Sequence, residues 1–201
     1  MSSSYPKGFV SKITDIKEKK LKGLYEISSV AYEDHRGYMA RYYDRDTFHK
    51  HGLDMNWLQE SRSLTYKKHT VRGLHIHLPP YIEGKLIECI RGRMLWVNVD
   101  LRLSSPTFGQ WETTELDGSK FHSLYISPGF ANGCISLTDD ADLMIKANQV
   151  FDTKHSAGII WNDPDLAIDW QIGDAAPIIS DAHKKYMSFA EFKQRYKGLP
   201  L

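Results

Sequence analysis

The sequence predicts an all-β domain, a sandwich or a barrel. Residues 94–101 alternate between apolar and mixed side chains, the pattern of a half-buried strand. Short segments of this kind recur along the chain and are separated by Gly, Pro and Ser turns. Aromatic residues are frequent, with 11 Tyr, 8 Phe and 5 Trp, as in β-rich cores. Together these observations favour a sandwich or barrel over alternating βαβ units.

The N-terminal third contains weaker signals. Residues 16–22 form a charge run, which we expect to be a solvated segment of an N-terminal arm covering about residues 1–22. A short strand is predicted over 23–27. An aromatic strand is predicted over 38–43, after a turn at 35–37. Asp46 is placed to N-cap a short helix that runs to His51 and ends at Gly52.

The centre and the C-terminal part are more regular. Strands are predicted over 85–90, 94–101, 124–126 and 143–150, with Gly92 marking a hairpin turn. Ser188 and Glu191 form a capping box, which predicts a helix to about residue 197. No repeat or linker divides the chain, so we expect one domain over residues 1–201, with a C-terminal helical segment over about 181–201.

Composition excludes several classes of partner. The 26 Lys and Arg are balanced by 25 Asp and Glu, so no basic field predicts nucleic-acid binding. No apolar run approaches the ~20 residues of a membrane span. The N-terminus has no apolar signal region, and we expect a cytoplasmic protein. Cys89 and Cys134 lie among apolar residues and are predicted to be buried free thiols.

The most informative stretch is residues 72–77, RGLHIH. In an unbroken strand, Arg72 and Leu74 would face one way, and His75 and His77 the other. Two imidazoles on one face, beside Arg72 and Lys85, suit either proton transfer on an anionic substrate or metal binding.

The metal reading lacks ligands. A metal site needs three or four convergent ligands. Jelly-roll metal sites often combine two histidines two residues apart with a glutamate a few residues later. The next acid after His77 is Glu83, but Lys85, a cation, lies nearest to the position where that glutamate is usual. Asn132 occupies the later turn where a third histidine would be wanted. We therefore expect no metal.

Proton transfer uses the same residues better. A neutral histidine can deprotonate a carbon beside a ketone if a cation stabilises the resulting enolate oxygen. Lys85 or Arg72 is suited to that role. Arg36 and Arg72 could also hold a phosphate through bidentate hydrogen bonds.

The chain resembles the dTDP-4-dehydrorhamnose 3,5-epimerase family, in order from about residue 25 to residue 189. The resemblance rests on these motifs: RGLH at 72–75, GKL at 84–86, VNVDLR at 97–102, SPTFG at 105–109, PGFANG at 128–133, WNDP at 161–164 and AIDW at 167–170. It implies a cupin-type jelly-roll sandwich with a few short peripheral helices, a homodimer, no metal and no cofactor. It also implies a substrate that is a nucleotide-linked 4-keto-6-deoxy sugar, with dTDP the most expected nucleotide.

The resemblance also implies roles for individual residues. His75 matches the catalytic base, and Lys85 matches the lysine near the 4-keto group of the sugar. Arg72 and Arg36 would lie by the phosphates or the sugar, and Gln59 matches a nucleotide-contacting glutamine.

Other positions depart from the family. The tyrosine acid opposite the base becomes Phe151, and a second active-site tyrosine becomes Ile145. Asn132 replaces a histidine. His183 replaces the aspartate that orients the base, unless a shift in alignment puts Asp181 there. Phe151 cannot donate a proton, and loss of a carboxylate partner should lower the basicity of His75.

Further departures at Met39 and Arg41 suggest a shifted substrate, so another nucleotide stays open. The leading prediction is an isomerase: a 3- or 3,5-epimerase-like enzyme of deoxysugar and surface-polysaccharide biosynthesis. A second possibility is a sugar-nucleotide 3,4-ketoisomerase that uses His75 and His77, since enzymes of that kind resemble this chain in having both histidines. A third is a catalytically impaired homologue that binds sugar nucleotide without turnover. A metal cupin would rest on the two histidines alone.

Overall fold

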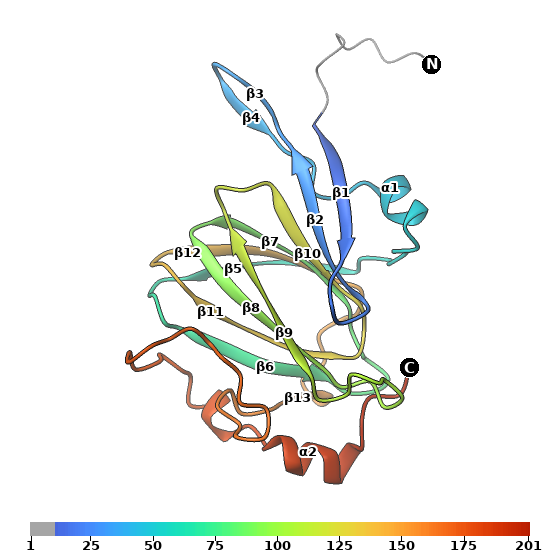
Figure 1. Cartoon of the computed structure of the whole chain (residues 1–201), viewed down its shortest axis with the longest axis vertical. Coiled ribbons are helices and arrows are strands. Elements are labelled where there is room, and N and C mark those ends of the chain that lie inside the picture. The colour runs from blue at the N-terminus through green and yellow to red at the C-terminus, as the bar shows by residue number, and fades with distance from the viewer. Residues whose placement is uncertain (1–10) are drawn as a thin grey trace.

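The computed structural model describes residues 11–201 as two facing antiparallel sheets with two short α-helices outside them (Figure 1). The six-stranded sheet has the order β1 (Lys12–Glu18), β2 (Leu24–Val30), β10 (His122–Ile126), β7 (Lys85–Arg91), β12 (Ala141–Ala147) and β5 (Gln59–Thr65). The five-stranded sheet has the order β13 (Ser156–Gly158), β6 (Val71–His77), β11 (Phe130–Ser136), β8 (Arg93–Asp100) and β9 (Trp111–Asp117). The all-β prediction is confirmed.

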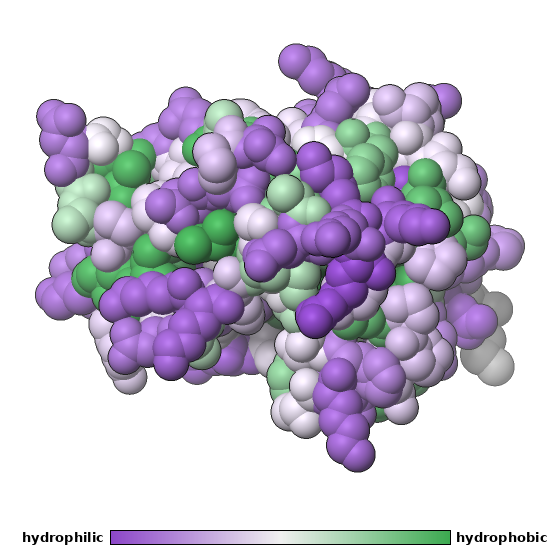
Figure 2. Space-filling model, turned by 90° about the horizontal axis from the view of Figure 1, so that it is seen from below, coloured by the Kyte–Doolittle hydropathy of each residue, from purple (hydrophilic) through white to green (hydrophobic). Residues whose placement is uncertain are grey.

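A β-hairpin and two short α-helices lie outside the two large sheets. β3 (Tyr32–Asp34) and β4 (Gly37–Met39) form a hairpin that projects from the body of the molecule (Figure 1). α1 (Arg45–Lys50) lies beside the N-terminal strands, and α2 (Phe189–Tyr196) lies beyond β6 (Figure 1). Seen from the side of α2, the surface is largely hydrophilic, with separate smaller apolar patches (Figure 2). No helix within residues 11–201 is long and apolar enough to cross a membrane.

Apolar side chains pack in three layers. The inner cluster fills one end of the space between the sheets: Leu21, Leu24, Ile87, Cys89, Met94, Trp96, Leu116, Leu124, Ile126, Phe130, Cys134, Ala141 and Leu143. A second cluster joins the outer face of the five-stranded sheet to the C-terminal segment and includes Leu95, Val97, Trp170 and Phe192. A third covers the outer face of the six-stranded sheet with Phe48 and Leu53.

This layering corrects one strand prediction. Residues Met94 to Asp100 are buried on both faces, so β8 is not half-buried. The apolar face, with Leu95 and Val97, packs on the C-terminal segment, while Met94 and Trp96 face the other sheet. The alternation is genuine, but each face has a covering layer.

Several boundaries also differ from the predictions. Residues 12–18 form strand β1 on β2, so the charge run is in part a paired edge strand, whose Ile13 and Ile16 pack in the cluster on the outer face of the sheet. Only Gly37–Met39 of the predicted strand 38–43 is extended in a ladder. The helix cap is Asp44, whose carboxylate accepts the Thr47 amide, not Asp46. β12 ends at Ala147 rather than at residue 150.

Other local predictions are confirmed. Gly92 has φ +74° in the turn between β7 and β8, a conformation that suits glycine. The capping box of Ser188 and Glu191 begins α2, and Lys197 ends it. Cys89 and Cys134 are buried and free. Residues 1–10 of the expected N-terminal arm lie outside the described residues.

Candidate active site

A bulge in β6 sets the direction of the key side chains. The register between β6 and β11 shifts between Asn132 and Cys134, at Gly73, whose φ is +106°. Arg72 lies opposite Cys134, a member of the inner cluster, while Leu74 packs in the C-terminal cluster. The expectation that Arg72 and Leu74 share a face is therefore wrong. The bulge turns Arg72 to the same inward side as His75.

Opposite the inner cluster, the space between the sheets is polar. We call this region the polar end and define it by inward residues of four strands: Arg72, His75, His77, Lys85, Asn98 and Asn132. Asn132 lies opposite both His75 and Asn98 in the ladders, which places the three on one face. Asn98, which the sequence did not single out, is fully buried, and its amide has no hydrogen-bond partner among residues 11–201.

His75 contacts a second imidazole. Its Nε2 lies 3.2 Å from Nε2 of His183, which belongs to the 3-10 turn His183–Lys185. The Gly73 amide donates to Nδ1 of His183 at 3.4 Å. His183 is therefore protonated on Nε2 and donates to His75, which leaves the proton of neutral His75 on Nδ1.

The sequence left open whether Asp181 or His183 pairs with His75. The Asp181 side chain is 89% exposed and pairs with Lys184 at 3.0 Å. His183 is the residue in contact with His75, and Tyr186 stacks on it with ring centroids 4.9 Å apart. The base therefore has a neutral imidazole, not a carboxylate, as its partner.

The surroundings of His75 strongly disfavour its protonated form. Burial, followed by the charges of Lys85 and the neighbouring His183, lowers the pKa of His75 to about 3. Glu83 opposes this effect, and Arg72 adds to it. In this environment the imidazole of His75 is neutral at physiological pH. Because its Nε2 lone pair accepts the hydrogen bond from His183, His75 can take up a proton only after it changes tautomer or releases His183.

Lys85 lies at the centre of the polar end. Its Nζ donates to Oδ1 of Asn132 at 3.2 Å and lies 2.8 Å from Oε1 of Glu83. The same Glu83 oxygen lies 2.9 Å from Nδ1 of His77. Burial alone would raise the pKa of Glu83, but its contacts with His77 and Lys85 lower it to about 2.

Glu83 is thus a site residue that the sequence analysis set aside. It was considered only as a poor metal ligand. The available signal was an acid within reach of both His77 and Lys85 across a short loop. Residues 11–201 contain no group of three or more His, Cys, Asp or Glu arranged to hold a metal ion.

The remaining predicted residues divide into two groups. Gln59 accepts the Phe151 amide at 2.8 Å, and the Phe151 ring lies 5.3 Å from that of His77 although Phe151 is 60% exposed. Ile145 packs against the inner cluster. Arg36 lies apart from this region: it is exposed on the β3–β4 hairpin and forms an ion pair with Asp34 at 2.6 Å.

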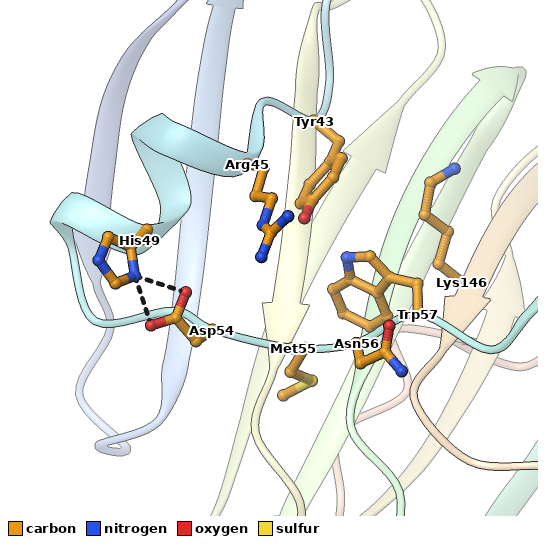
Figure 3. A pocket seen from close by; sticks show the side chains of 8 residues that line it. All are labelled: Tyr43, Arg45, His49, Asp54, Met55, Asn56, Trp57 and Lys146. Carbon is orange, nitrogen blue, oxygen red and sulfur yellow. Dashed lines mark hydrogen bonds and ion pairs between the residues drawn. The ribbon is translucent and has the colours of Figure 1, made fainter.

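A hollow of about 790 Å³ lies on the other side of the six-stranded sheet (Figure 3). Tyr43, Met55 and Trp57, which line it, pack in the cluster on the outer face of that sheet, away from the polar end. Its His49 pairs with Asp54, and its Lys146 pairs with Glu60. The chemistry therefore favours the polar end as the site.

Known proteins show the same fold. The family model for dTDP-4-dehydrorhamnose 3,5-epimerase matches residues 18–191. An epimerase of that name from Sinorhizobium fredii is 36% identical over 137 residues, covering 68% of this chain and 70% of its own length.

Two solved structures are also similar. One is the 3,5-epimerase of Legionella pneumophila in complex with dTDP-4-keto-L-rhamnose, with 30% identity, a TM-score of 0.81, and coverage of 87% of this chain and 92% of that one. The other is ChmJ, a 3'-monoepimerase of Streptomyces bikiniensis in complex with dTDP-quinovose, with 29% identity, a TM-score of 0.83 and coverage of 90% of each chain. The cupin-type jelly-roll prediction is confirmed. The chain belongs to the dTDP-4-dehydrorhamnose 3,5-epimerase family.

Proposed function

We propose that this protein is an isomerase that epimerises a nucleotide-linked 4-keto-6-deoxy sugar by abstracting a proton from a carbon next to the ketone. The observation that carries the proposal is the meeting of His75 with Lys85 and Asn132 at the polar end, in the fold of this epimerase family. A general base and a fixed cation within one enclosed region are what enolisation of a ketone requires.

The chemistry divides between named side chains. His75 removes the proton from carbon, and the electrons of that C–H bond move into the ketone, whose oxygen becomes negative. Lys85 stabilises that oxygen electrostatically. Arg72, which donates to Thr65 at 3.2 Å and is held at the inward bulge, binds an anionic group of the substrate. A proton returned from solvent to the opposite side of the carbon completes an epimerisation.

The nucleotide is proposed to be dTDP, with others possible. Both solved relatives described above were crystallised with dTDP-linked sugars. We further propose a homodimer, a cytoplasmic location and a role in deoxysugar or surface-polysaccharide biosynthesis. Assembly is supported by the projecting β3–β4 hairpin, where Tyr38 and Met39 are 58% and 55% exposed beside Arg36. Apolar side chains exposed to this degree on a hairpin favour a partner surface.

A second candidate function is 3,4-ketoisomerisation. It is favoured by His77, which shares the inward face of β6 with His75 and contacts Glu83. Ile145 and Phe151, by contrast, carry no proton to donate from the other side of the site. Moving a ketone from C4 to C3 passes through an enediol and needs proton carriers on one side only.

Solvent exchange distinguishes these functions. The protein is incubated with dTDP-4-keto-6-deoxyglucose in D2O, and deuterium at C3 and C5 is followed by NMR. Label at C3 alone, or at C3 and C5, with the 4-ketone retained, is the result expected for a single or double epimerase. A 3-ketone product would support the isomerase. No label from dTDP-, UDP-, CDP- or GDP-linked substrates, with binding retained, would overturn both and identify a binding protein without turnover.

A further inference from the structure

The two inward histidines of β6 have partners of different chemistry. His75 meets the neutral imidazole of His183, whereas His77 meets the carboxylate of Glu83, with 2.9 Å between Nδ1 and Oε1. A carboxylate behind an imidazole fixes its tautomer and stabilises its protonated form. Of the two side chains, His77 is therefore the one that lies against an acid, while His75 lies against a second imidazole.

The loop before β7 fixes Glu83 in place. The backbone amide of Gly84 donates to Oδ1 of Asn148 at 2.7 Å. In return, the backbone amide of Asn148 donates to the Gly84 carbonyl oxygen at 3.3 Å. Residues on either side of Gly84 therefore have defined positions. A Cβ on Gly84 would lie 2.8 Å from the Ile126 carbonyl oxygen, so the glycine permits this close approach.

Burial makes the arrangement costly unless every charge is paired. The side chains of His77, Glu83 and Lys85 are 7%, 9% and 14% exposed. A buried carboxylate is tolerated when cations compensate it, and Glu83 has two candidate cations within 3 Å. With Lys85 alone the carboxylate would already be paired. The second contact places the same carboxylate oxygen against Nδ1 of His77.

Nε2 of His77 is available for chemistry. Both ring nitrogens of His77 are buried and neither makes a hydrogen bond among the described residues, but Nδ1 lies 2.9 Å from Oε1 of Glu83. The charged or titratable groups around it are His75 on the same strand, Lys85 on β7 and Glu83 before β7, while the Phe151 ring lies 5.3 Å away. Nothing in this set competes with a substrate oxygen for the Nε2 proton.

We propose that His77 and Glu83 form a second proton-transfer pair that acts on the carbonyl oxygen of the sugar, with His77 in contact with substrate and Glu83 as its positioning residue. The proposal rests on the proposed function but holds for both the epimerase and the ketoisomerase. Residues i and i+2 of a strand stand about 7 Å apart on one side of the sheet. Neighbouring atoms of one edge of a sugar are thus within reach of the two imidazoles.

The two histidines share the proton transfers of one enolisation. His75 takes the carbon-bound proton, and the electrons of that bond form the enolate. The His77 imidazolium then gives its Nε2 proton to the enolate oxygen and becomes neutral. In the reverse direction His77 recovers the proton from the enol oxygen while carbon is reprotonated. In a ketoisomerase, His77 moves the proton between the two enediol oxygens. No oxidant or metal is required.

The experiment measures deuterium exchange from D2O into dTDP-4-keto-6-deoxyglucose for the full-length wild type, His77→Gln, Glu83→Gln, Glu83→Asp and the double variant H77Q/E83Q. We expect His77→Gln to lower kcat for exchange about 10²-fold with KM changed less than about threefold. Glu83→Gln should lower kcat about tenfold, and Glu83→Asp should recover part of the loss.

The double variant separates positioning from structure. If Glu83 acts through His77, Glu83→Gln should cause little further loss when His77 is already Gln. Asp142→Asn is the matched control, since Asp142 is another buried carboxylate in an ion pair, with Arg62 at 2.6 Å, but lies on β12 away from the polar end. It should leave exchange unchanged. His77→Gln keeps the Glu83–Lys85 ion pair, so this variant still tests the role of His77 even if Glu83→Gln does not fold.

Three results would overturn the inference in whole or in part. Wild-type exchange rates in folded His77→Gln, in a protein whose wild type exchanges, would remove the second proton-transfer pair and leave the proposed function standing. Full additivity of the two losses would remove the positioning role of Glu83. Absence of exchange in the wild type itself, with every sugar nucleotide tried, would overturn the proposed function together with the inference.

Discussion

The space between the two sheets has ends of opposite character. The inner cluster closes one end with side chains such as Ile87, Leu124 and Leu143, each at most 1% exposed. The polar end holds imidazoles, a lysine and amides between the same strands. Strand β7 contributes Ile87 to one and Lys85 to the other, two residues apart. One strand thus supplies stability and chemistry, and substitutions should separate them.

The largest expected effect is that of His75→Asn. Loss of the base should lower the rate of solvent exchange at the substrate carbon about 10³- to 10⁴-fold, because general base catalysis is worth that order. The melting temperature should stay close to that of the wild type, since no buried charge is left behind. NMR-detected exchange and thermal unfolding check the two halves. A large drop in stability would show that the polar end is structural as well.

Acid should destabilise the protein through the same residue. The pKa of His75 is lowered to about 3 in the folded state, against about 6.5 when unfolded, so below pH 6.5 the unfolded chain binds the extra proton first. Stability is therefore full above pH 6.5 and falls towards pH 3, by no more than about 5 kcal/mol from this group. Urea unfolding from pH 7 to pH 4 measures the fall, which His75→Asn should reduce. An identical slope in that variant would contradict this assignment.

Leu124→Ala tests the apolar end. It should lower the free energy of unfolding by about 2–5 kcal/mol, the usual cost of truncating a fully buried leucine. At a temperature where the variant is folded, kcat for exchange should remain within about twofold of wild type, since Leu124 packs in the inner cluster and pairs with Ile87. Chemical denaturation and exchange kinetics provide the comparison. A selective loss of kcat would show that the two ends are coupled.

Lys85→Met removes one positive charge from the polar end. The rate of exchange should fall about 10²- to 10³-fold, the cost of losing one preorganised stabiliser of an oxyanion. Glu83 would keep its contact with His77, which limits the structural damage. Lys85→Arg, which keeps the charge, should recover part of the rate. Equal rates for the Met and Arg variants would argue against an electrostatic role.

The smallest effect is a gain. His183→Asp gives His75 a carboxylate partner in place of a neutral ring, which should raise the pKa of His75 and increase kcat about tenfold near neutral pH. The pH profile of the exchange rate measures the change in pKa, and its acidic limb should move to higher pH. His183→Asn, which adds no charge, is the matched control. If Asp and Asn behave alike, the charge of the partner does not limit the base.

Sequence reasoning reached the fold and most of the polar end because those signals are local or belong to a family. The alternation in β8, the turn at Gly92 and the capping box of α2 are each encoded within a few residues. The direction of Arg72 was missed because a bulge depends on the facing strand. Glu83 was missed because its position arises from a loop that brings it against both His77 and Lys85.

The face-to-face glycines of β6 and β11 have a consequence for how this site can evolve. A Cβ on Gly73 would lie 2.8 Å from Cα of Gly133, and one on Gly133 would lie 2.7 Å from the carbonyl oxygen of Arg72. Neither position can gain a side chain before the other strand moves. Substitutions that change specificity are therefore not tolerated at these two glycines. They can be tolerated at side chains around the polar end, such as positions 83, 145 and 183. A library built for altered sugar chemistry should vary those side chains and leave both glycines fixed.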